Sequence, residues 1–300
     1  MTKVIEVTNL NKTIKGKSVL TDLRFTLYQG DCVALIGPNG AGKTTLMSCL
    51  LGDYWTKAGQ VTVLGFAPTD NILKEKIAVL FQDNVIESDL KVKEILTFQR
   101  AIYPNPLSEA AIDDLLGFSP AQKEQFADKL SGGQRRLLSF VKILIGQPDI
   151  IILDEPTAGM DTSTRKRFWE IVGELKKVGK TILYSSHYIE EVEHTAERIL
   201  LLNQGKLIRD TTPYDLQWED QEKCFSFPES YLASLTNCPF YDVAIKAGRA
   251  TVMTKAPEQV LQALLEDNCP VSAIEMTNRS LLTTLFMKAG NNDDTTDSFA

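Results

Sequence analysis

The spacing of apolar residues along the chain separates three kinds of element. Apolar and polar positions alternate over residues 4–7 and 19–27, which predicts short strands of a small antiparallel sheet, with a further strand over 60–64. Uninterrupted apolar runs are typical of buried parallel strands, and they occupy residues 33–36, 76–81, 149–153 and 181–185. Between the second and third runs the period becomes helical and prolines interrupt it, so we expect a helical subdomain over about 83–146.

A smaller set of elements follows residue 212, where we place the end of a first domain that begins at residue 1. Helices are expected over residues 257–266 and 280–288, and strands over residues 224–227, 241–245, 250–254 and 271–276. These elements predict a small accessory α+β domain of ferredoxin-like type over residues 219–289, in which we find no catalytic constellation. The polar, acidic residues 290–300 are expected to be a disordered tail.

Composition narrows the class of protein. The 300 residues are 43% apolar and 24% charged, a balance typical of a soluble protein of about two domains. A net charge of −7 argues against a nucleic-acid binder, because such proteins usually carry a basic excess. No run of 18 apolar residues and no signal-like segment occurs, so we expect a cytoplasmic chain. The five cysteines form no CxxC pair, which favours reduced thiols over a zinc site or disulfides.

The turn after the apolar run at 33–36 carries candidate chemistry. Residues 37–45 read GPNGAGKTT, and a helical pattern follows them. The glycines let backbone N–H groups face one anion, the helix N-terminus adds its dipole, Lys43 supplies a mobile charge and the Thr44 hydroxyl suits Mg²⁺. A glycine-rich turn before an ordinary helix is the alternative, which the spacing disfavours. The expected phosphate-binding residues are Gly37, Pro38, Asn39, Gly40, Ala41, Gly42, Lys43, Thr44 and Thr45.

A second stretch of small residues, LSGGQ at residues 130–134, also precedes a long helical pattern. The Ser131 hydroxyl and the backbone of Gly132 and Gly133 predict another anion site at a helix N-terminus, although a helix cap alone would explain Ser131. The arginines that follow, Arg135 and Arg136, are interpreted as solvated charges on the outer face of the helix.

An acidic pair ends the buried strand predicted over residues 149–153. Open α/β sheets place ligand chemistry at the carboxyl ends of parallel strands, where Asp154 and Glu155 fall. We expect Asp154 to hold Mg²⁺ through water and Glu155 to orient or deprotonate an attacking water.

Taken in order, GPNGAGKTT, Gln82, LSGGQ, IIILDEP and His187 resemble the ATP-binding subunit of ATP-binding-cassette (ABC) transporters. The segments AGMD at 158–161 and SSHYIEEVEHTAERI from residue 185 are similar to stand-alone subunits of exporter-type systems. The resemblance implies an α/β P-loop NTPase fold with a mainly parallel core sheet, an antiparallel β subdomain and a helical subdomain. It covers residues 1–212 and extends, less closely, to the small C-terminal α+β domain.

The resemblance also implies how an ATP site is assembled. Two copies, or one copy and a related ATPase, pack head to tail, so that each ATP lies between one phosphate loop and the partner's LSGGQ. Gln82 joins Thr44 as a Mg²⁺ ligand, and His187 contacts the γ-phosphate and water, although each residue alone could be a solvated strand end. The residues expected to act across the dimer are Ser131, Gly132, Gly133, Gln134 and Asp161.

For function, the resemblance implies ATP hydrolysis that powers transport, with export as the expected direction, through separate membrane-spanning permease subunits at the inner face of the cell membrane. The alternative is a soluble ATPase of the same superfamily that acts on ribosomes or nucleic acid.

One departure from the family pattern concerns the residue expected to contact the adenine base. The family usually places an aromatic ring where this chain has Ile14, so we expect weaker stacking on the base.

Overall fold

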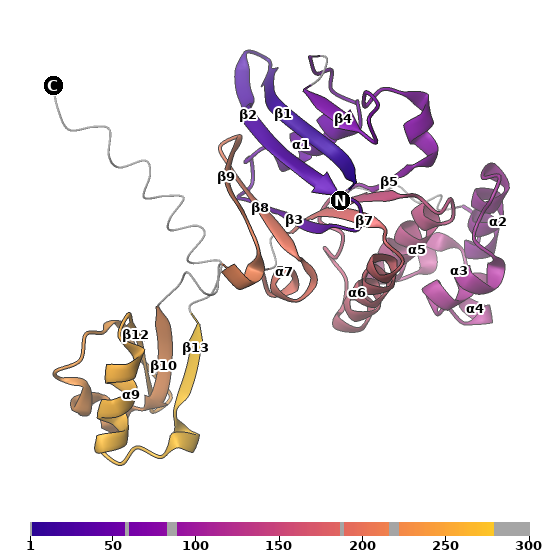
Figure 1. The fold of residues 1–300 in the computed structure, drawn as a ribbon. Coiled ribbons are helices and arrows are strands. Elements are labelled where there is room, and N and C mark those ends of the chain that lie inside the picture. Colours follow the sequence, from indigo (N-terminus) through magenta and orange to yellow (C-terminus); the bar gives the residue numbers. More distant parts are fainter. Residues whose placement is uncertain (1, 58–59, 83–88, 187–188, 216–221, 279–300) are drawn as a thin grey trace. The chain divides into compact units, whose positions relative to one another are not determined.

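The computed structural model divides the chain into two compact units, Met1–Thr211 and Thr212–Ala300, which are described separately (Figure 1). The structure describes residues 2–57, 60–82, 89–186, 189–215 and 222–278. His187, the expected helix over 280–288 and the expected tail over 290–300 therefore lie outside the described residues.

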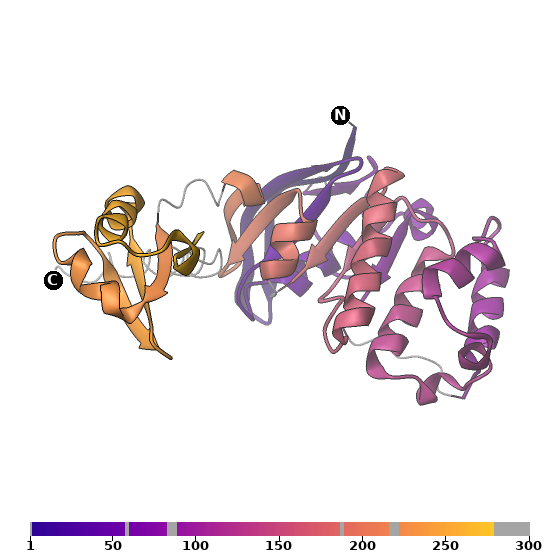
Figure 2. The same cartoon turned by 90° about the horizontal axis from the view of Figure 1, so that it is seen from below.

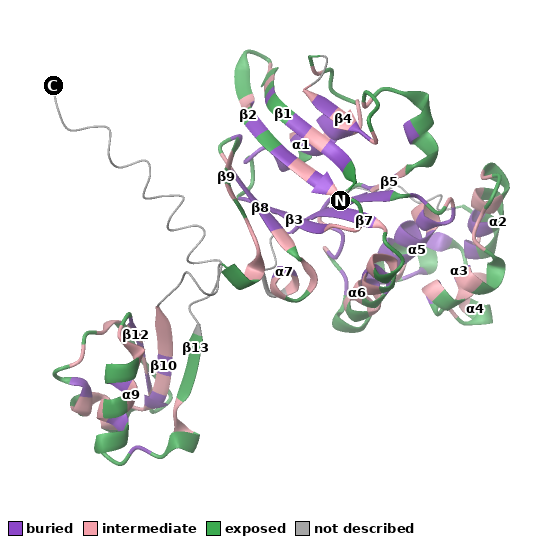
Figure 3. Ribbon diagram, in the orientation of Figure 1, coloured by how far each residue is buried: buried purple, intermediate pink, exposed green. Residues whose placement is uncertain are grey.

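A six-stranded sheet forms the centre of the first unit, in the order β5-β6-β7-β3-β8-β9. Its first five strands are parallel, and β9 pairs with β8 in the antiparallel direction. The strands β3, β6 and β7 are buried along their whole length (Figure 3), as expected for apolar runs covered on both faces. The bounds are β3 (Cys32–Ile36), β5 (Ile77–Leu80), β6 (Ile150–Leu153), β7 (Thr181–Ser185), β8 (Arg198–Asn203) and β9 (Lys206–Thr211).

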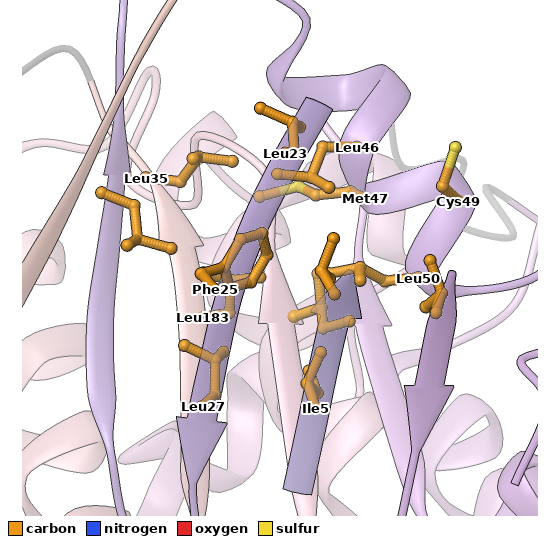
Figure 4. Packing of buried hydrophobic residues seen from close by; sticks show 14 of the residues in the cluster. Ile5, Leu23, Phe25, Leu27, Leu35, Leu46, Met47, Cys49, Leu50 and Leu183 are labelled. Carbon is orange, nitrogen blue, oxygen red and sulfur yellow. The ribbon is translucent and has the colours of Figure 1, made fainter. Parts of the chain in front are cut away.

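A three-stranded antiparallel sheet, β2-β1-β4, faces the central sheet across helix α1 (Lys43–Leu50). Its strands are β1 (Lys3–Ile14), β2 (Lys17–Tyr28) and β4 (Val61–Val63). Strand β1 is much longer than the predicted 4–7, because register shifts at Val7/Leu10 and Leu10/Lys12 interrupt its alternation without ending its pairing with β2. Figure 4 shows the core between these layers, formed by Ile5, Leu23, Phe25, Leu27, Leu35, Leu46, Met47, Leu50 and Leu183.

Helices α5 (Gly132–Leu144), α6 (Thr162–Lys177) and α7 (Ile189–Thr195) cover the central sheet on the side away from α1 (Figure 2). The rings of Phe140 and Phe168 pack with centroids 4.2 Å apart and join α5 to α6. Val178, the residue that follows the last residue of α6, is exposed. The helical subdomain adds α2 (Val92–Ile102), α3 (Glu109–Leu116), α4 (Pro120–Lys123) and the short 3-10 turn Ala127–Lys129.

The second unit is a four-stranded antiparallel sheet in the order β11-β12-β10-β13. This order, with helix α9 (Pro257–Glu266) and the 3-10 segment Glu229–Leu235 as the two crossovers, is that of a ferredoxin-like βαββαβ sheet. Its core is formed by Phe225, Phe227, Val252, Val260 and Leu264. The strands are β10 (Lys223–Pro228), β11 (Tyr241–Lys246), β12 (Arg249–Thr254) and β13 (Glu275–Asn278).

The strand predicted over 271–276 is wrong in its first half. Residues Val271–Ala273 form a 3-10 turn, in which the Ala273 N–H donates to the carbonyl of Pro270 at 2.8 Å. Pairing with β10 begins only at Glu275. Val271 therefore belongs to the turn, and Ile274 lies between the turn and the strand. Among the described helices of the chain, none is long and apolar enough to cross a membrane.

Candidate functional site

The glycine-rich turn links the end of β3 directly to the start of α1. Gly42 is the N-cap of α1 with φ 105°, and Gly40 has φ 82°, values that side-chain-bearing residues rarely adopt. Gly37 lies against β8, and a Cβ atom there would come within 2.1 Å of the Leu202 carbonyl oxygen. The turn therefore needs glycine at these positions, and its backbone bends around an open space.

Lys43 begins α1 and folds back over the turn. Its ammonium donates to the carbonyl oxygens of Gly37 at 2.7 Å and Pro38 at 3.2 Å. Burial lowers the pKa of Lys43, while the nearby charges of Glu155 and Asp154 act in the opposite direction. A buried ammonium held mainly by carbonyl oxygens gains from an arriving anion, because the anion supplies a full opposite charge.

Asp154, the first residue after β6, joins three elements through its buried carboxylate. Thr44 Oγ1 donates to its Oδ2 at 3.0 Å, and Ser185 Oγ donates to its Oδ1 at 2.6 Å. Ser185 Oγ in turn accepts the Glu155 N–H at 2.8 Å. Ser185 was not predicted as a site residue, although its position at the end of the buried strand β7 could have suggested it.

Glu155 and Gln82 meet at the mouth of the same site. Gln82 Nε2 donates to Glu155 Oε2 at 3.2 Å, although the two residues are 73 positions apart in the chain. Glu155 is half-buried and has φ 44°, a left-handed conformation that costs free energy in a residue with a side chain. The backbone thus turns sharply after β6 and presents this carboxylate beside the phosphate loop.

One cavity of about 270 Å³ unites these groups. It is lined by Val19, Asn39, Gly40, Gly42, Lys43, Thr44, Thr45, Gln82, Asp154 and Glu155. Ile14, the residue expected near an adenine, does not line it. Ile14 ends β1 and pairs with Lys17 across the turn, so Val19 is the apolar residue that reaches the cavity.

The LSGGQ residues lie away from this cavity and begin helix α5. Ser131 is the N-cap: its Oγ accepts the Gln134 N–H at 3.2 Å, and Gln134 Oε1 accepts the Ser131 N–H at 3.0 Å. Ser131 therefore caps α5, as the helix-cap alternative predicts. Ser131 and Gly132 are nevertheless exposed, which leaves this helix N-terminus accessible to a second molecule.

Asp161 lies next to that N-terminus and caps α6. Its carboxylate accepts from the backbone N–H and hydroxyl of both Ser163 and Thr164 at 2.6–3.0 Å. These hydrogen bonds, the Ser163 hydroxyl first, hold the pKa of Asp161 well below its usual range. A Cβ on Gly133 would come within 3.1 Å of Asp161 Oδ2, so a larger residue there would press on the cap.

The interpretation of Arg136 as a solvated charge is wrong, whereas Arg135 is exposed as expected. Arg136 is only 9% exposed and donates to backbone carbonyls at the ends of β5 and β6. Arg136 shares the buried part of α5 with Gly133 and Phe140, which lie three residues before it and four residues after it.

The fold and this site define a class: the nucleoside triphosphatases in which a glycine-rich turn, a basic side chain and an acidic strand end share one cavity. A family model described as ABC transporter matches residues 20–158. The chain is 36% identical over 218 residues to the Nod factor export ATP-binding protein I of Rhizobium etli, covering 71% of this chain and 69% of that protein. With the protein of the same name from Burkholderia lata it shares 34% identity, covering 71% and 72%.

Solved structures of ATP-binding cassettes have the same fold as the first unit. A structure of the ATP-binding subunit of an ABC transporter superposes with a TM-score of 0.63 at 26% identity, over 72% of this chain and 92% of that one. A dimeric ATP-binding cassette in a post-hydrolysis state with ADP and phosphate superposes at 0.62 with 23% identity, over 70% of this chain and 98% of that one, which shows the shared fold. The chain belongs to the family of ATP-binding subunits of ABC transporters. The predicted family and α/β P-loop fold are confirmed: the protein is an ATPase that powers transport.

Proposed function

We propose that this chain binds and hydrolyses Mg²⁺-ATP as a head-to-tail dimer and thereby drives export through separate membrane-spanning permease subunits. The observation that carries the proposal is the cavity in which Lys43, Thr44, Gln82, Asp154 and Glu155 converge. A basic group, a hydroxyl, an amide and two carboxylates around one phosphate-sized turn suit a nucleoside triphosphate better than an uncharged ligand.

The phosphate end of the nucleotide occupies the turn formed by residues 37–45. Lys43 leaves the carbonyls of Gly37 and Pro38 for the β- and γ-phosphates, since phosphate oxygens offer full negative charge. The backbone N–H groups of the turn and the hydroxyl of Thr45 complete the phosphate contacts. The open N-terminus of α1 adds its dipole.

The residues beside this turn fit Mg²⁺. Thr44, Gln82 and Asp154 supply the neutral and anionic oxygens that this hard cation prefers. The described part of the chain holds no group of three or more His, Cys, Asp and Glu side chains suited to a metal ion. Thr44, Gln82 and Asp154 fit a cation that binds together with its nucleotide, because Mg²⁺ sites of this kind use one or two carboxylates together with substrate phosphates. When bound, Mg²⁺ neutralises charge on the phosphoryl oxygens.

Glu155 is the group that accepts a proton from, or orients, the attacking water. Its carboxylate is held by the Gln82 amide at 3.2 Å and lies on the cavity wall, so a water beside the γ-phosphate would be within its reach. His187 is proposed to contact the γ-phosphate as well, and it lies outside the described residues.

The dimer completes each site. Ser131, Gly132, Gly133 and Gln134 form a helix N-terminus that does not line the chain's own cavity, and Ser131 and Gly132 are exposed. We propose that this N-terminus, with Asp161 beside it, meets the γ-phosphate bound by a partner copy or a related ATPase. Closure then depends on ATP, and hydrolysis lets the dimer reopen.

Export is favoured by the relatives, which are named export ATP-binding proteins, over the alternative of a ribosome- or nucleic-acid-associated ATPase. The net charge of −7 also disfavours a nucleic-acid partner. The chain would then sit at the inner face of the cell membrane, bound to its permease.

The proposal is tested by coexpressing the tagged chain with candidate polytopic permease proteins from the same genome. Purification in detergent should recover a stoichiometric complex, and reconstitution into liposomes should stimulate ATP hydrolysis. Lys43→Ala should abolish nucleotide binding without dissociating the complex, while the exposed Lys15→Ala should behave as the wild type. Recovery of the chain with ribosomes and not with membranes would overturn the transport partner.

Direction is tested in cells by comparing the small molecules of the medium and of the cytoplasm by mass spectrometry. Cells carrying Lys43→Ala should retain a compound that wild-type cells release. A compound that the variant fails to take up from the medium would contradict export.

A further inference from the structure

Arg136 lies where two neighbouring strands of the central sheet end. Strands β5 and β6 pair in register from Ile77 with Ile150 to Leu80 with Leu153, and the last bond of this ladder runs from the Asp154 N–H to the Leu80 carbonyl at 2.8 Å. Beyond this bond the two segments no longer pair with each other, and their buried and part-buried carbonyl groups need other donors.

The guanidinium of Arg136 supplies those donors. Nε donates to the carbonyl of Pro156 at 3.0 Å, and Nη2 donates to the carbonyls of Asp154 at 2.9 Å and Glu155 at 3.3 Å. Nη1 donates to the carbonyls of Phe81 and of Gln82, the latter at 3.0 Å. One planar side chain thus binds five carbonyls, and a guanidinium has five N–H donors in a fixed fork.

The two segments that Arg136 holds carry the site. Gln82 and Asp154 line the cavity together with Glu155, and the backbone carbonyl of each of the three accepts from Arg136. The arginine itself belongs to α5, which packs against β5 and begins with the Ser131 cap. In the proposed dimer, the N-terminus of α5 contacts the ATP of the partner copy, whereas the ends of β5 and β6 contact the chain's own ATP. The Arg136 side chain therefore connects parts of two different ATP sites.

We propose that Arg136 is a positioning residue of the ATPase: it fixes Gln82 and Glu155 relative to each other and to the start of α5, without touching the nucleotide. The inference rests on the proposed roles of these residues and of the LSGGQ segment. It predicts that loss of the fork misplaces the water-orienting groups while the phosphate turn, which Arg136 does not contact, keeps its affinity for ATP.

The test compares Arg136→Lys with the matched substitution Arg135→Lys on the exposed side of the same helix. Lysine keeps the charge but has three donors from one atom, so it cannot satisfy five carbonyls in a plane. In Arg136→Lys we expect kcat to fall by about tenfold or more, because small displacements of positioned groups are costly, while KM and the Kd for a fluorescent ATP analogue stay within about twofold. Arg135→Lys should retain wild-type values.

Turnover is expressed per nucleotide-binding site, so unfolded molecules do not contribute to the comparison. For Arg136→Ala, ethylguanidine should restore part of kcat and ethylammonium should not. An unchanged kcat, or a fall in kcat matched by an equal loss of affinity, would overturn the inference.

If Arg136→Lys does not fold, hydrogen exchange in the wild-type protein tests the hydrogen-bond network of Arg136. The Nε–H of Arg136 should exchange with solvent at least about a hundredfold more slowly than that of the exposed Arg135, and equal rates would overturn the network. The proposed function is tested separately by Glu155→Gln. If that variant loses turnover and Arg136→Lys does not, only the positioning role fails.

Discussion

Thr44 Oγ1 lies 3.0 Å from Asp154 Oδ2, although the two residues are 110 positions apart. The fold therefore holds the second-last residue of the glycine-rich turn next to the carboxylate that follows β6. Thr44→Val removes the hydroxyl at nearly constant volume. If Thr44 is the Mg²⁺ ligand proposed above, we expect the Mg²⁺ concentration for half-maximal hydrolysis to rise about tenfold, because one oxygen ligand is then lost. Titration of Mg²⁺ in the ATPase assay measures this, with Thr44→Ser as the control that should stay near the wild type.

Glu155→Gln should lower kcat by about a hundredfold or more, because an amide cannot accept the proton of the attacking water. The variant keeps an oxygen that can accept from Gln82, so nucleotide binding should persist and ATP should trap a dimer. Phosphate release and size-exclusion chromatography with ATP measure the two effects. Full turnover would exclude Glu155 as the base, and the exposed Glu174→Gln serves as the matched control.

Ser185→Ala should destabilise the protein and slow hydrolysis together. The substitution leaves Asp154 Oδ1 and the Glu155 N–H without the hydroxyl that each now binds in a buried position. We expect the free energy of unfolding to fall by about 1–3 kcal/mol, the usual cost of such unpaired groups. Urea unfolding of this variant and of the exposed Ser18→Ala measures the difference, and equal stabilities would count against the network.

Ile14→Tyr should tighten ATP binding by about two- to tenfold, which corresponds to about 0.5–1.5 kcal/mol for an aromatic contact. The residue sits on the hairpin that also brings Val19 to the cavity, so a longer ring can extend over the base. Calorimetric titration with ATP measures the change, and Ile14→Leu should leave affinity unaltered. No gain in affinity would show that the adenine does not reach this hairpin.

Asp161 gives a pH dependence with a defined sign. Its hydrogen bonds hold the pKa below its ordinary value of 3.8, so the unfolded chain takes up a proton before the folded protein does. The stabilisation is complete above about pH 4 and is lost as pH falls through the pKa of the folded state. Urea unfolding should show Asp161→Asn less stable than the wild type at pH 7, with a smaller gap near pH 3. An equal gap at both pH values would contradict the charged cap.

Local patterns predicted much of the first unit. The buried strands β3, β6 and β7 were found from their apolar runs, since burial on both faces leaves a signal in a few consecutive residues. The glycine-rich turn over residues 37–45 was found because its glycines, lysine and threonines are adjacent in the chain. The full length of β1 was missed, because its register shifts break the alternation that a period of two requires.

Arg136 was misread for a different reason. A charge in a helix is solvated unless another element offers it partners, and here the partners are carbonyls that the helical segment itself does not contain. The turn at Val271–Ala273 was misread because apolar spacing alone does not separate a short strand from a 3-10 turn.

The sequence by itself determined the glycine-rich turn, the order of the motifs and the family, because each of these depends on short continuous stretches of residues. Only the tertiary structure decided which stretches share a cavity. The strand order β5-β6-β7-β3 brings Gln82, Asp154 and Ser185 to the phosphate turn, and it also buries Arg136. Contacts between residues so far apart depend on how parallel strands are ordered by their crossovers, which no local period of apolar residues encodes.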